Sequence, residues 1–208
     1  MALEGTHIRF AAALKDELKV VDIDKFIAGT IYPDSRYLTG INRDLTHNDD
    51  FLDKDFLVDD FNKGWFVHCL CDKVQLKALI EYFPQMMNSK DKDEWFVNFS
   101  ALKNVQDLYE MKNFDIQPYL KCLDYVDNPN QEEIKKIAGF NKMVQKMYSV
   151  RDITMESLSS MWLTLGLKPE IVGRVIAVTA EFSKDKKIMI QIEKVFDKML
   201  INTKNYKF

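Results

Sequence analysis

An uncharged run inside a helical pattern limits the folds that are open to this chain. The stretch GWFVHCLCD, residues 64–72, contains no acidic or basic residue other than a histidine before it reaches Asp72. A helix with so little polar surface has to be buried among other elements. The same stretch carries His68 and Asp72, two side chains that a hydrophobic interior normally excludes. The fold must therefore supply both groups with partners inside the protein.

Helical periodicity also dominates the rest of the chain. Positions 7, 10, 11, 14 and 18 follow the i, i+3, i+4, i+7, i+11 stripe of one helix face. Strand signals are weak, because no alternating run is bounded by an Asn-Gly or Asp-Gly turn. A chain of 208 residues is long enough to bury one substantial core. We expect a single all-α domain, residues 1–208, built as a bundle of about seven to nine helices.

Capping residues and helix breakers predict where the first helices begin and end. A short helix from near Asp22 is expected to stop at Gly29, where a left-handed residue closes a helix at little cost. The following segment TIYPDSRYLTG is then expected to be a loop. An aspartate-rich connection leads to the helix that contains GWFVHCLCD. Asp59 or Asp60 is expected to cap that helix.

Charge and composition exclude several classes of protein. The formal net charge of −3 gives no reason to expect nucleic acid or an anionic membrane as the main partner. The N-terminal sequence MALEGTHIRFAAALKDEL lacks the pattern of a signal peptide, and no apolar run is long enough for a transmembrane segment. Three cysteines do not make a disulfide framework. These features predict a reduced, cytoplasmic protein and leave its oligomeric state open.

His68 and Asp72 have the spacing of a chelating pair. Residues at i and i+4 project from the same face of a helix, one turn apart. One cation can therefore contact an imidazole nitrogen and a carboxylate oxygen at once, as it does in helical H-x-x-x-H zinc sites. A His–Asp hydrogen bond on an exposed face is the alternative interpretation. A lysine or arginine from another helix could also compensate the carboxylate.

Three further residues could complete a metal site. His7 lies on the apolar stripe of the first helix, Asp34 in a Pro-Asp turn, and His47 in a Leu-Thr-His sequence. A core-facing histidine is more often a hydrogen-bonded packing residue than a ligand. Three imidazoles and two carboxylates together nevertheless suit Zn²⁺, and Mn²⁺, Fe²⁺ or Co²⁺ accept the same donors.

The order of these segments resembles a known enzyme family. Thr-His at residues 6–7, GTIYPDSRY at 29–37, LTH at 45–47 and GWFVHCLCD at 64–72 follow one another along the chain. This order is similar to that of the zinc-dependent phospholipase C and single-strand nuclease superfamily, and in particular to its compact bacterial branch. The resemblance covers about the first 75 residues. It implies a metal-site half at about residues 1–84, supported by helices at about 94–203.

The resemblance also implies roles for the individual residues. His47, His68, Asp72 and Asp34 would surround a first metal ion, while His7 and a bridging Asp72 would bind a second. Asp34 would in addition be the general base. The secreted members use a free N-terminal amine and later histidines as further ligands, whereas this chain starts MALEGTH and has no histidine after His68. One zinc ion, or two, is therefore expected rather than three.

Two more residues are weaker candidates for substrate binding. Arg36 follows Asp34 by two positions and could contact a phosphate, although a surface salt bridge is the more common role of such an arginine. Asp107 could point into the cavity from a later helix, although an ordinary structural role is the more common one. Neither residue belongs to a chelating pattern.

These observations lead to one leading hypothesis and two competitors. The leading hypothesis is a metal-dependent hydrolase of a small phosphoester, with a metal-activated water as nucleophile. An HD-type phosphohydrolase requires adjacent His-Asp, but His7, His47 and His68 are followed by other residues. The non-enzyme alternative is a helical metal-binding scaffold or interaction protein that retains a reduced phospholipase C-like site.

Overall fold

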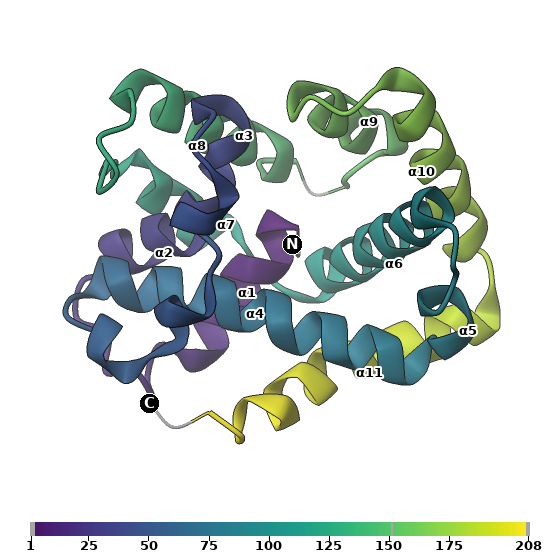
Figure 1. Cartoon of the computed structure of the whole chain (residues 1–208), viewed down its shortest axis with the longest axis horizontal. Coiled ribbons are helices and arrows are strands. Elements are labelled where there is room, and N and C mark those ends of the chain that lie inside the picture. The colour runs from purple at the N-terminus through teal and green to yellow at the C-terminus, as the bar shows by residue number, and fades with distance from the viewer. Residues whose placement is uncertain (1–2, 151, 207–208) are drawn as a thin grey trace.

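The protein is built from helices joined by short turns and by longer connections at residues 40–59 and 121–133 (Figure 1). A computed structural model describes residues 3–150 and 152–206, so the first two residues of the MALEGTH segment lie outside the described part. Within these ranges no strand occurs, as the all-α prediction requires. The α-helices are α1 (Glu4–Leu14), α2 (Ile23–Ile31), α3 (Arg36–Thr39), α4 (Asp60–Tyr82), α5 (Pro84–Met87), α6 (Lys92–Asn113), α7 (Gln117–Leu120), α8 (Ile134–Tyr148), α9 (Met155–Thr164), α10 (Pro169–Phe182) and α11 (Lys186–Thr203).

The number of helices differs from the predicted seven to nine. The described residues form eleven α-helices, of which three, α3, α5 and α7, have only four residues each. A single turn shows no repeating apolar stripe, so periodicity cannot reveal it. The acidic connection before α4 also contains three short 3₁₀ helices, η2 (Arg43–Leu45), η3 (Asp49–Leu52) and η4 (Lys54–Phe56).

The prediction that a helix ends at Gly29 was wrong. Helix α2 continues to Ile31 and is followed by a 3₁₀ helix, η1 (Tyr32–Ser35), and then by α3. The segment expected to be a loop is therefore largely helical. Gly40, not Gly29, is the glycine that ends this region in the left-handed conformation, with φ of 79°. Asp22 and Asp59 do cap α2 and α4, each through a side-chain bond to a backbone amide.

Gly29 has a different role, which is to let two helices approach each other. A Cβ atom on Gly29 would lie 2.1 Å from the backbone oxygen of Phe61, and one on Gly64 would lie 2.0 Å from that of Phe26. Helices α2 and α4 can therefore pack backbone against backbone only because both positions are glycine. This close contact places the residues that follow Gly29 beside the middle of α4.

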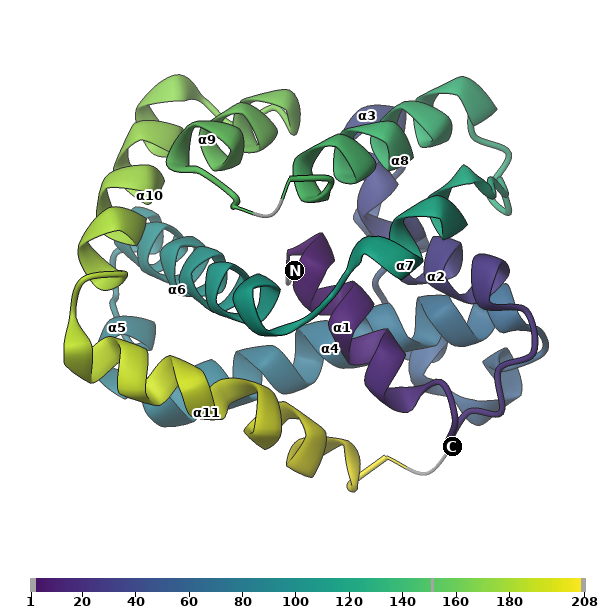
Figure 2. The ribbon, with the colours of Figure 1, turned by 180° about the vertical axis from the view of Figure 1, so that it is seen from behind.

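Helix α1 lies in the centre of the molecule (Figures 1 and 2). It packs on α2, α4 and α6, and its buried side chains join an apolar core that extends from Leu3 to Met199. Helices from the second half of the chain thus cover the first half. The result is that several polar residues on α1 and α4, among them His7 and His68, are fully buried.

Candidate metal centre

The structure brings the five predicted ligand residues together in one place. His7 comes from α1, Asp34 from η1, His47 from the turn after η2, and His68 and Asp72 from α4. Three of them, His7, Asp34 and His68, have no exposed surface. Their donor atoms form two groups of three, each with all atoms within 4.8 Å of one another. The groups are His7, His68 and Asp72, and Asp34, His47 and His68.

The tautomer of His68 is set by a backbone carbonyl. His68 Nδ1 lies 2.8 Å from the carbonyl oxygen of Thr30, which follows Gly29 on α2. Because a carbonyl oxygen can only accept, Nδ1 carries the proton and donates it. The neutral ring therefore presents the lone pair of Nε2 to the cluster, which is the arrangement that a metal-binding histidine needs. Burial lowers the pKa of His68 to about 4, although Asp34 and Asp72 act to raise it.

The tautomer of His47 depends on the Thr46 hydroxyl. This hydroxyl oxygen lies 2.7 Å from His47 Nδ1 and 3.1 Å from the carbonyl oxygen of Arg43, and it has one proton to donate. When the proton goes to Arg43, Nδ1 of His47 donates to the hydroxyl and the lone pair of the ring is on Nε2. When the proton goes to His47 Nδ1, the ring proton is on Nε2.

The two Nε2 atoms lie at hydrogen-bond distance from each other. His47 Nε2 and His68 Nε2 are 3.1 Å apart, so a proton on His47 Nε2 can be donated to the lone pair of His68 Nε2. In the other tautomer of His47 both lone pairs are directed at the same space, where a metal ion would fit between them. Two ligand atoms at zinc distances and the tetrahedral angle are roughly 3.3–3.4 Å apart. The observed separation is close to that value.

Asp34 adds an oxygen at a comparable distance. Its Oδ1 is 3.3 Å from His47 Nε2, and its Oδ2 is 3.9 Å from His68 Nε2. Neither oxygen has a hydrogen-bond donor among the described residues. Burial alone would raise the pKa of Asp34, but the imidazoles of His68 and His47 outweigh it and hold that pKa at about 2. The carboxylate is therefore ionised at neutral pH.

Asp72 gives the cluster a second negative charge. Its Oδ2 lies 3.9 Å from both His47 Nε2 and His68 Nε2. Burial raises the pKa of Asp72, but interactions with neighbouring groups, His68 and His7 among them, bring it well below its usual range. Buried Lys103 interacts with both carboxylates, and a divalent cation in the cluster would also compensate their charge.

His7 approaches the cluster from the side opposite His47. Its ring stacks on that of His68 at a centroid distance of 3.9 Å, and its Nε2 is 3.5 Å from Asp72 Oδ1. Burial, and then the neighbouring His68, lower the pKa of His7 well below the usual value. His7 is therefore a neutral donor next to a carboxylate. The second metal site that the resemblance implies, with His7 and a bridging Asp72, stays a prediction.

Asp107 holds α1 in position. Its carboxylate accepts bonds from the backbone amide of Thr6 at 2.7 Å, from the Thr6 hydroxyl at 2.9 Å and from the Tyr148 hydroxyl at 2.8 Å. These bonds fix the residue next to His7. The observed partners of Asp107 are thus structural, and its predicted contact with a substrate stays a prediction. The neighbouring Gly5 leaves room for this contact, because a Cβ there would be 2.6 Å from Tyr148.

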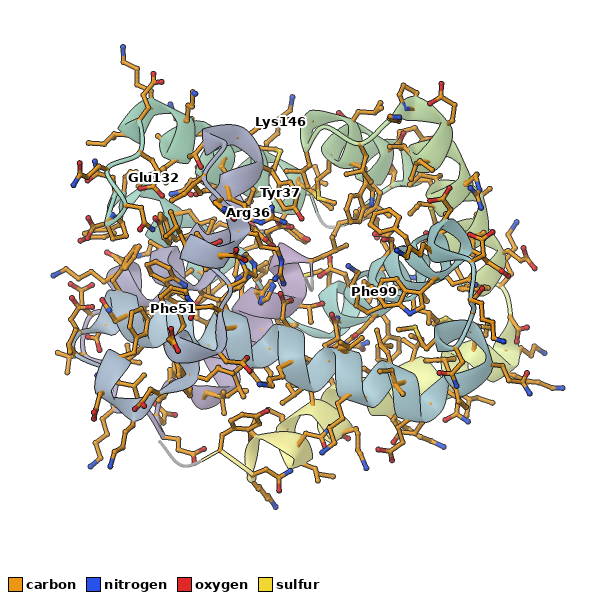
Figure 3. All side chains as sticks on the ribbon, in the orientation of Figure 1. Arg36, Tyr37, Phe51, Phe99, Glu132 and Lys146 are labelled. Carbon is orange, nitrogen blue, oxygen red and sulfur yellow. The ribbon has the colours of Figure 1, made fainter. Side chains whose placement is uncertain are left out.

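Arg36 lies beside Tyr37 rather than on the metal centre. Its guanidinium carbon is 4.0 Å from the centroid of the Tyr37 ring, and Nη2 donates to the Tyr37 hydroxyl at 2.6 Å (Figure 3). Its Nε has no hydrogen-bond acceptor among the described residues. A contact between Arg36 and a phosphate stays a prediction.

Sequence reasoning missed two buried charges near the cluster. Glu4 is 1% exposed, and burial together with the charge of Asp34 raises its pKa to about 8. Lys103 is 3% exposed, and burial lowers its pKa to about 8, although Asp72 and Asp34 act to raise it. Helical spacing could have indicated both, because Glu4 is one turn from His7 and Lys103 one turn from Asp107.

Glu4 makes the stability of the metal-free protein depend on pH. Its carboxyl is protonated in the folded protein up to a pKa of about 8 but ionises near 4.5 in the unfolded chain. Its contribution to stability is thus complete below pH 4.5 and is lost as the pH rises toward 8, at about 1.4 kcal/mol per pH unit. Glu4→Gln mimics the protonated form and removes the loss. We expect urea unfolding in the presence of a chelator to show that the free energy of unfolding of the variant, relative to that of the native protein, increases from pH 5 to pH 8. If the two free energies change with pH in parallel, the raised pKa of Glu4 is contradicted.

Comparison with protein-family models, with curated proteins and with solved structures found no match for this chain. No family assignment is therefore supported, and the resemblance noted in the sequence stays a prediction. The N-terminal amine, a ligand in the secreted members of the resembled superfamily, belongs to a residue outside the described part. In the described part of the chain, no helix has both the length and the apolar character required to cross a membrane.

Proposed function

We propose that this protein is a metal-dependent hydrolase of a phosphoester. In this proposal Asp34, His47, His68 and Asp72 hold the first ion, and His7 with Asp72 holds a second. The donor set of imidazoles and carboxylates suits Zn²⁺ and is compatible with Mn²⁺, Fe²⁺ or Co²⁺. The observation that carries the proposal is that the donor atoms of these five residues form two groups of three, each with all atoms within 4.8 Å of one another, although the residues come from four separate segments of the chain.

The residues of the cluster can perform the remaining steps of hydrolysis. A bound metal ion would lower the pKa of a water molecule and neutralise charge on the phosphoryl oxygens. Asp34 offers two oxygens, so one can bind the ion while the other accepts the proton of the attacking water. The water oxygen would form a bond to phosphorus as the ester P–O bond breaks, and the leaving alkoxide would take up the proton that Asp34 had accepted. Asp34 and His68 are fully buried, whereas the Asp72 side chain is 12% exposed.

Metal analysis of the purified, untagged protein tests the proposal first. We expect one or two transition-metal ions per chain, and an increase in unfolding temperature when Zn²⁺ or Mn²⁺ is added to chelator-treated protein. Acidic pH should release the ions, because protons compete for the imidazole lone pairs. A protein that contains no transition metal and is not stabilised by either ion would refute the proposal.

A second candidate function is a structural metal site without catalysis. It is favoured by the absence of any histidine after His68, which leaves the ligand set smaller than that of the resembled enzymes. The two candidates differ in turnover. Metal binding without hydrolysis of generic phosphomonoesters and phosphodiesters would favour the structural site.

A further inference from the structure

A cavity of about 400 Å³ opens directly beside the proposed metal centre. His47 and Asp72, two of the proposed ligands, form part of its wall. The remaining wall comes from the connection between η2 and η3, from α4 and from the first turns of α6. Its volume lies within the range of sites that bind small organic molecules. A ligand in this cavity would therefore contact the metal ligands at one point and other side chains around it.

A single cationic side chain on this wall is available for an anion. Lys73 is already paired with Asp49, at 2.9 Å, and so its charge is compensated. Arg43 lines the same cavity and forms no ion pair with another residue in the described ranges. Its carbonyl oxygen accepts the backbone amide of His47 at 2.9 Å, so both belong to one turn. The backbone of Arg43 is thus fixed next to a proposed metal ligand, and its exposed side chain lines the cavity.

The other part of the cavity wall is apolar. Leu76 is on the same face of α4 as Asp72, one turn further along, which places it about 6 Å from that ligand. Trp95 and Phe99 line the cavity from α6, with ring centroids 4.9 Å apart. In Figure 3 Phe99 lies between α6 and α4. A molecule that extends away from the metal centre would leave a polar wall and meet these side chains.

We infer that this cavity binds a small phosphoester whose organic group is aromatic or otherwise apolar. The phosphate contacts Arg43 and the metal centre, since guanidinium matches the geometry of phosphate oxygens. The organic group packs on Leu76, Trp95 and Phe99, where burial of apolar surface and ring contacts stabilise it. This inference rests on the proposed function and adds the class of substrate to it.

Binding of phosphonates that cannot be hydrolysed tests the inference. We would titrate metal-loaded protein with phenylphosphonate, methylphosphonate and inorganic phosphate in a calorimeter. Phenylphosphonate should bind tightest. Arg43→Ala should weaken all three ligands by roughly tenfold or more, because each loses a charge-assisted contact. Trp95→Ala should weaken phenylphosphonate by several-fold and leave the other two unchanged.

Lys73→Ala is the matched control for the arginine. It removes one positive charge from the same wall and leaves Asp49 unpaired. Because the Lys73 side chain is 45% exposed and that of Asp49 84%, solvent screens both charges and affinity should change less than twofold. If Arg43→Ala and Lys73→Ala lower the affinity equally, ligand binding depends only on the total positive charge of the wall and not on a contact with Arg43. That result would overturn the inference. Equal affinities for phenylphosphonate and methylphosphonate would overturn its apolar part.

The metal content of the same samples separates this inference from the proposed function. If metal binds but none of the three ligands does, the cavity assignment is wrong and the metal centre stands. If no metal binds, the proposed function fails, and titration of the metal-free protein decides about the cavity. Binding of phenylphosphonate that depends on Arg43 and Trp95 would then still support it, and absence of binding would overturn it.

Discussion

Replacing His68 with alanine is expected to abolish metal-dependent turnover. His68 is the one residue that both groups of three donors share, and its Nε2 is oriented by the Thr30 carbonyl. Without it, both groups lose their shared donor, and the first proposed site loses one of its two imidazole ligands. We expect the metal content to fall to background and hydrolysis of generic phosphoesters to fall on the order of a thousandfold. Metal analysis and a colorimetric assay on the same preparation measure both effects.

Asp34→Asn separates the proposed chemistry from metal binding. The substitution keeps the shape of the side chain but removes the charge and the basic oxygen. Turnover should fall by about 10²–10⁴-fold, the range that is typical of a lost general base, while part of the metal is retained. Asp50→Asn makes the same chemical change at an exposed position of η3 and should leave turnover unchanged. Full activity in both His68→Ala and Asp34→Asn would contradict the proposed site.

Part of the candidate site could be predicted from the sequence because it depends on local geometry. The i, i+4 spacing of His68 and Asp72 determines that they share a face of α4. The apolar stripe that contains His7 determines that this residue points inward, and the structure buries it completely. The order of the motifs then identified Asp34 and His47 as candidate ligands. In the structure, Asp34 Oδ1 lies 3.3 Å from His47 Nε2. Their binding of a metal stays a prediction.

Other parts could not be predicted because they depend on contacts between distant segments. The partners of Asp107, for example, come from α1 and α8, about 100 and 40 positions away in the chain. No pattern on α6 shows that its carboxylate anchors the helix of His7. The short helices α3, α5 and α7 likewise form where the chain turns against its neighbours, and one turn leaves no periodic signal.

Gly29 illustrates how one residue type supports two interpretations. A glycine near the end of a helical pattern is typical of a left-handed helix end, and it is equally typical of a close helix contact. The sequence of α2 contains no information about which helix packs on it. Only the position of Gly64 opposite it, 35 residues later, makes the second interpretation correct.

Replacing Gly64 with alanine is expected to destabilise the fold strongly and to disturb the metal centre. The added Cβ would lie 2.0 Å from the backbone oxygen of Phe26 and 2.7 Å from the amide nitrogen of Thr30. Backbone atoms cannot rotate away, so α2 and α4 have to separate. We expect a loss of at least about 3 kcal/mol in the free energy of unfolding, the upper part of the range for overpacked positions. Urea unfolding followed by circular dichroism measures it.

The separation of α2 and α4 in this variant should also weaken metal binding through His68. Thr30 is next to Gly29 on α2, and its carbonyl fixes the proton on His68 Nδ1. If α2 moves, this bond lengthens and Nε2 loses its orientation, so metal affinity should fall by about 10–100-fold, as it does when an outer-shell partner is lost. Metal titration of the folded fraction at low temperature distinguishes this loss of affinity from simple unfolding.

Gly139→Ala is the matched control for this prediction. Gly139 is also inside a helix, α8, but a Cβ there would have no other heavy atom within 4 Å. Alanine is the better helix former by about 1 kcal/mol, so this variant should be more stable than the native protein and should bind metal normally. Replacing glycine by alanine is thus expected to lower the free energy of unfolding at position 64 and to raise it at position 139. A Gly64→Ala protein as stable as the Gly139→Ala protein would show that α2 and α4 do not pack backbone against backbone. The orientation of His68 by Thr30 would then lose its structural basis.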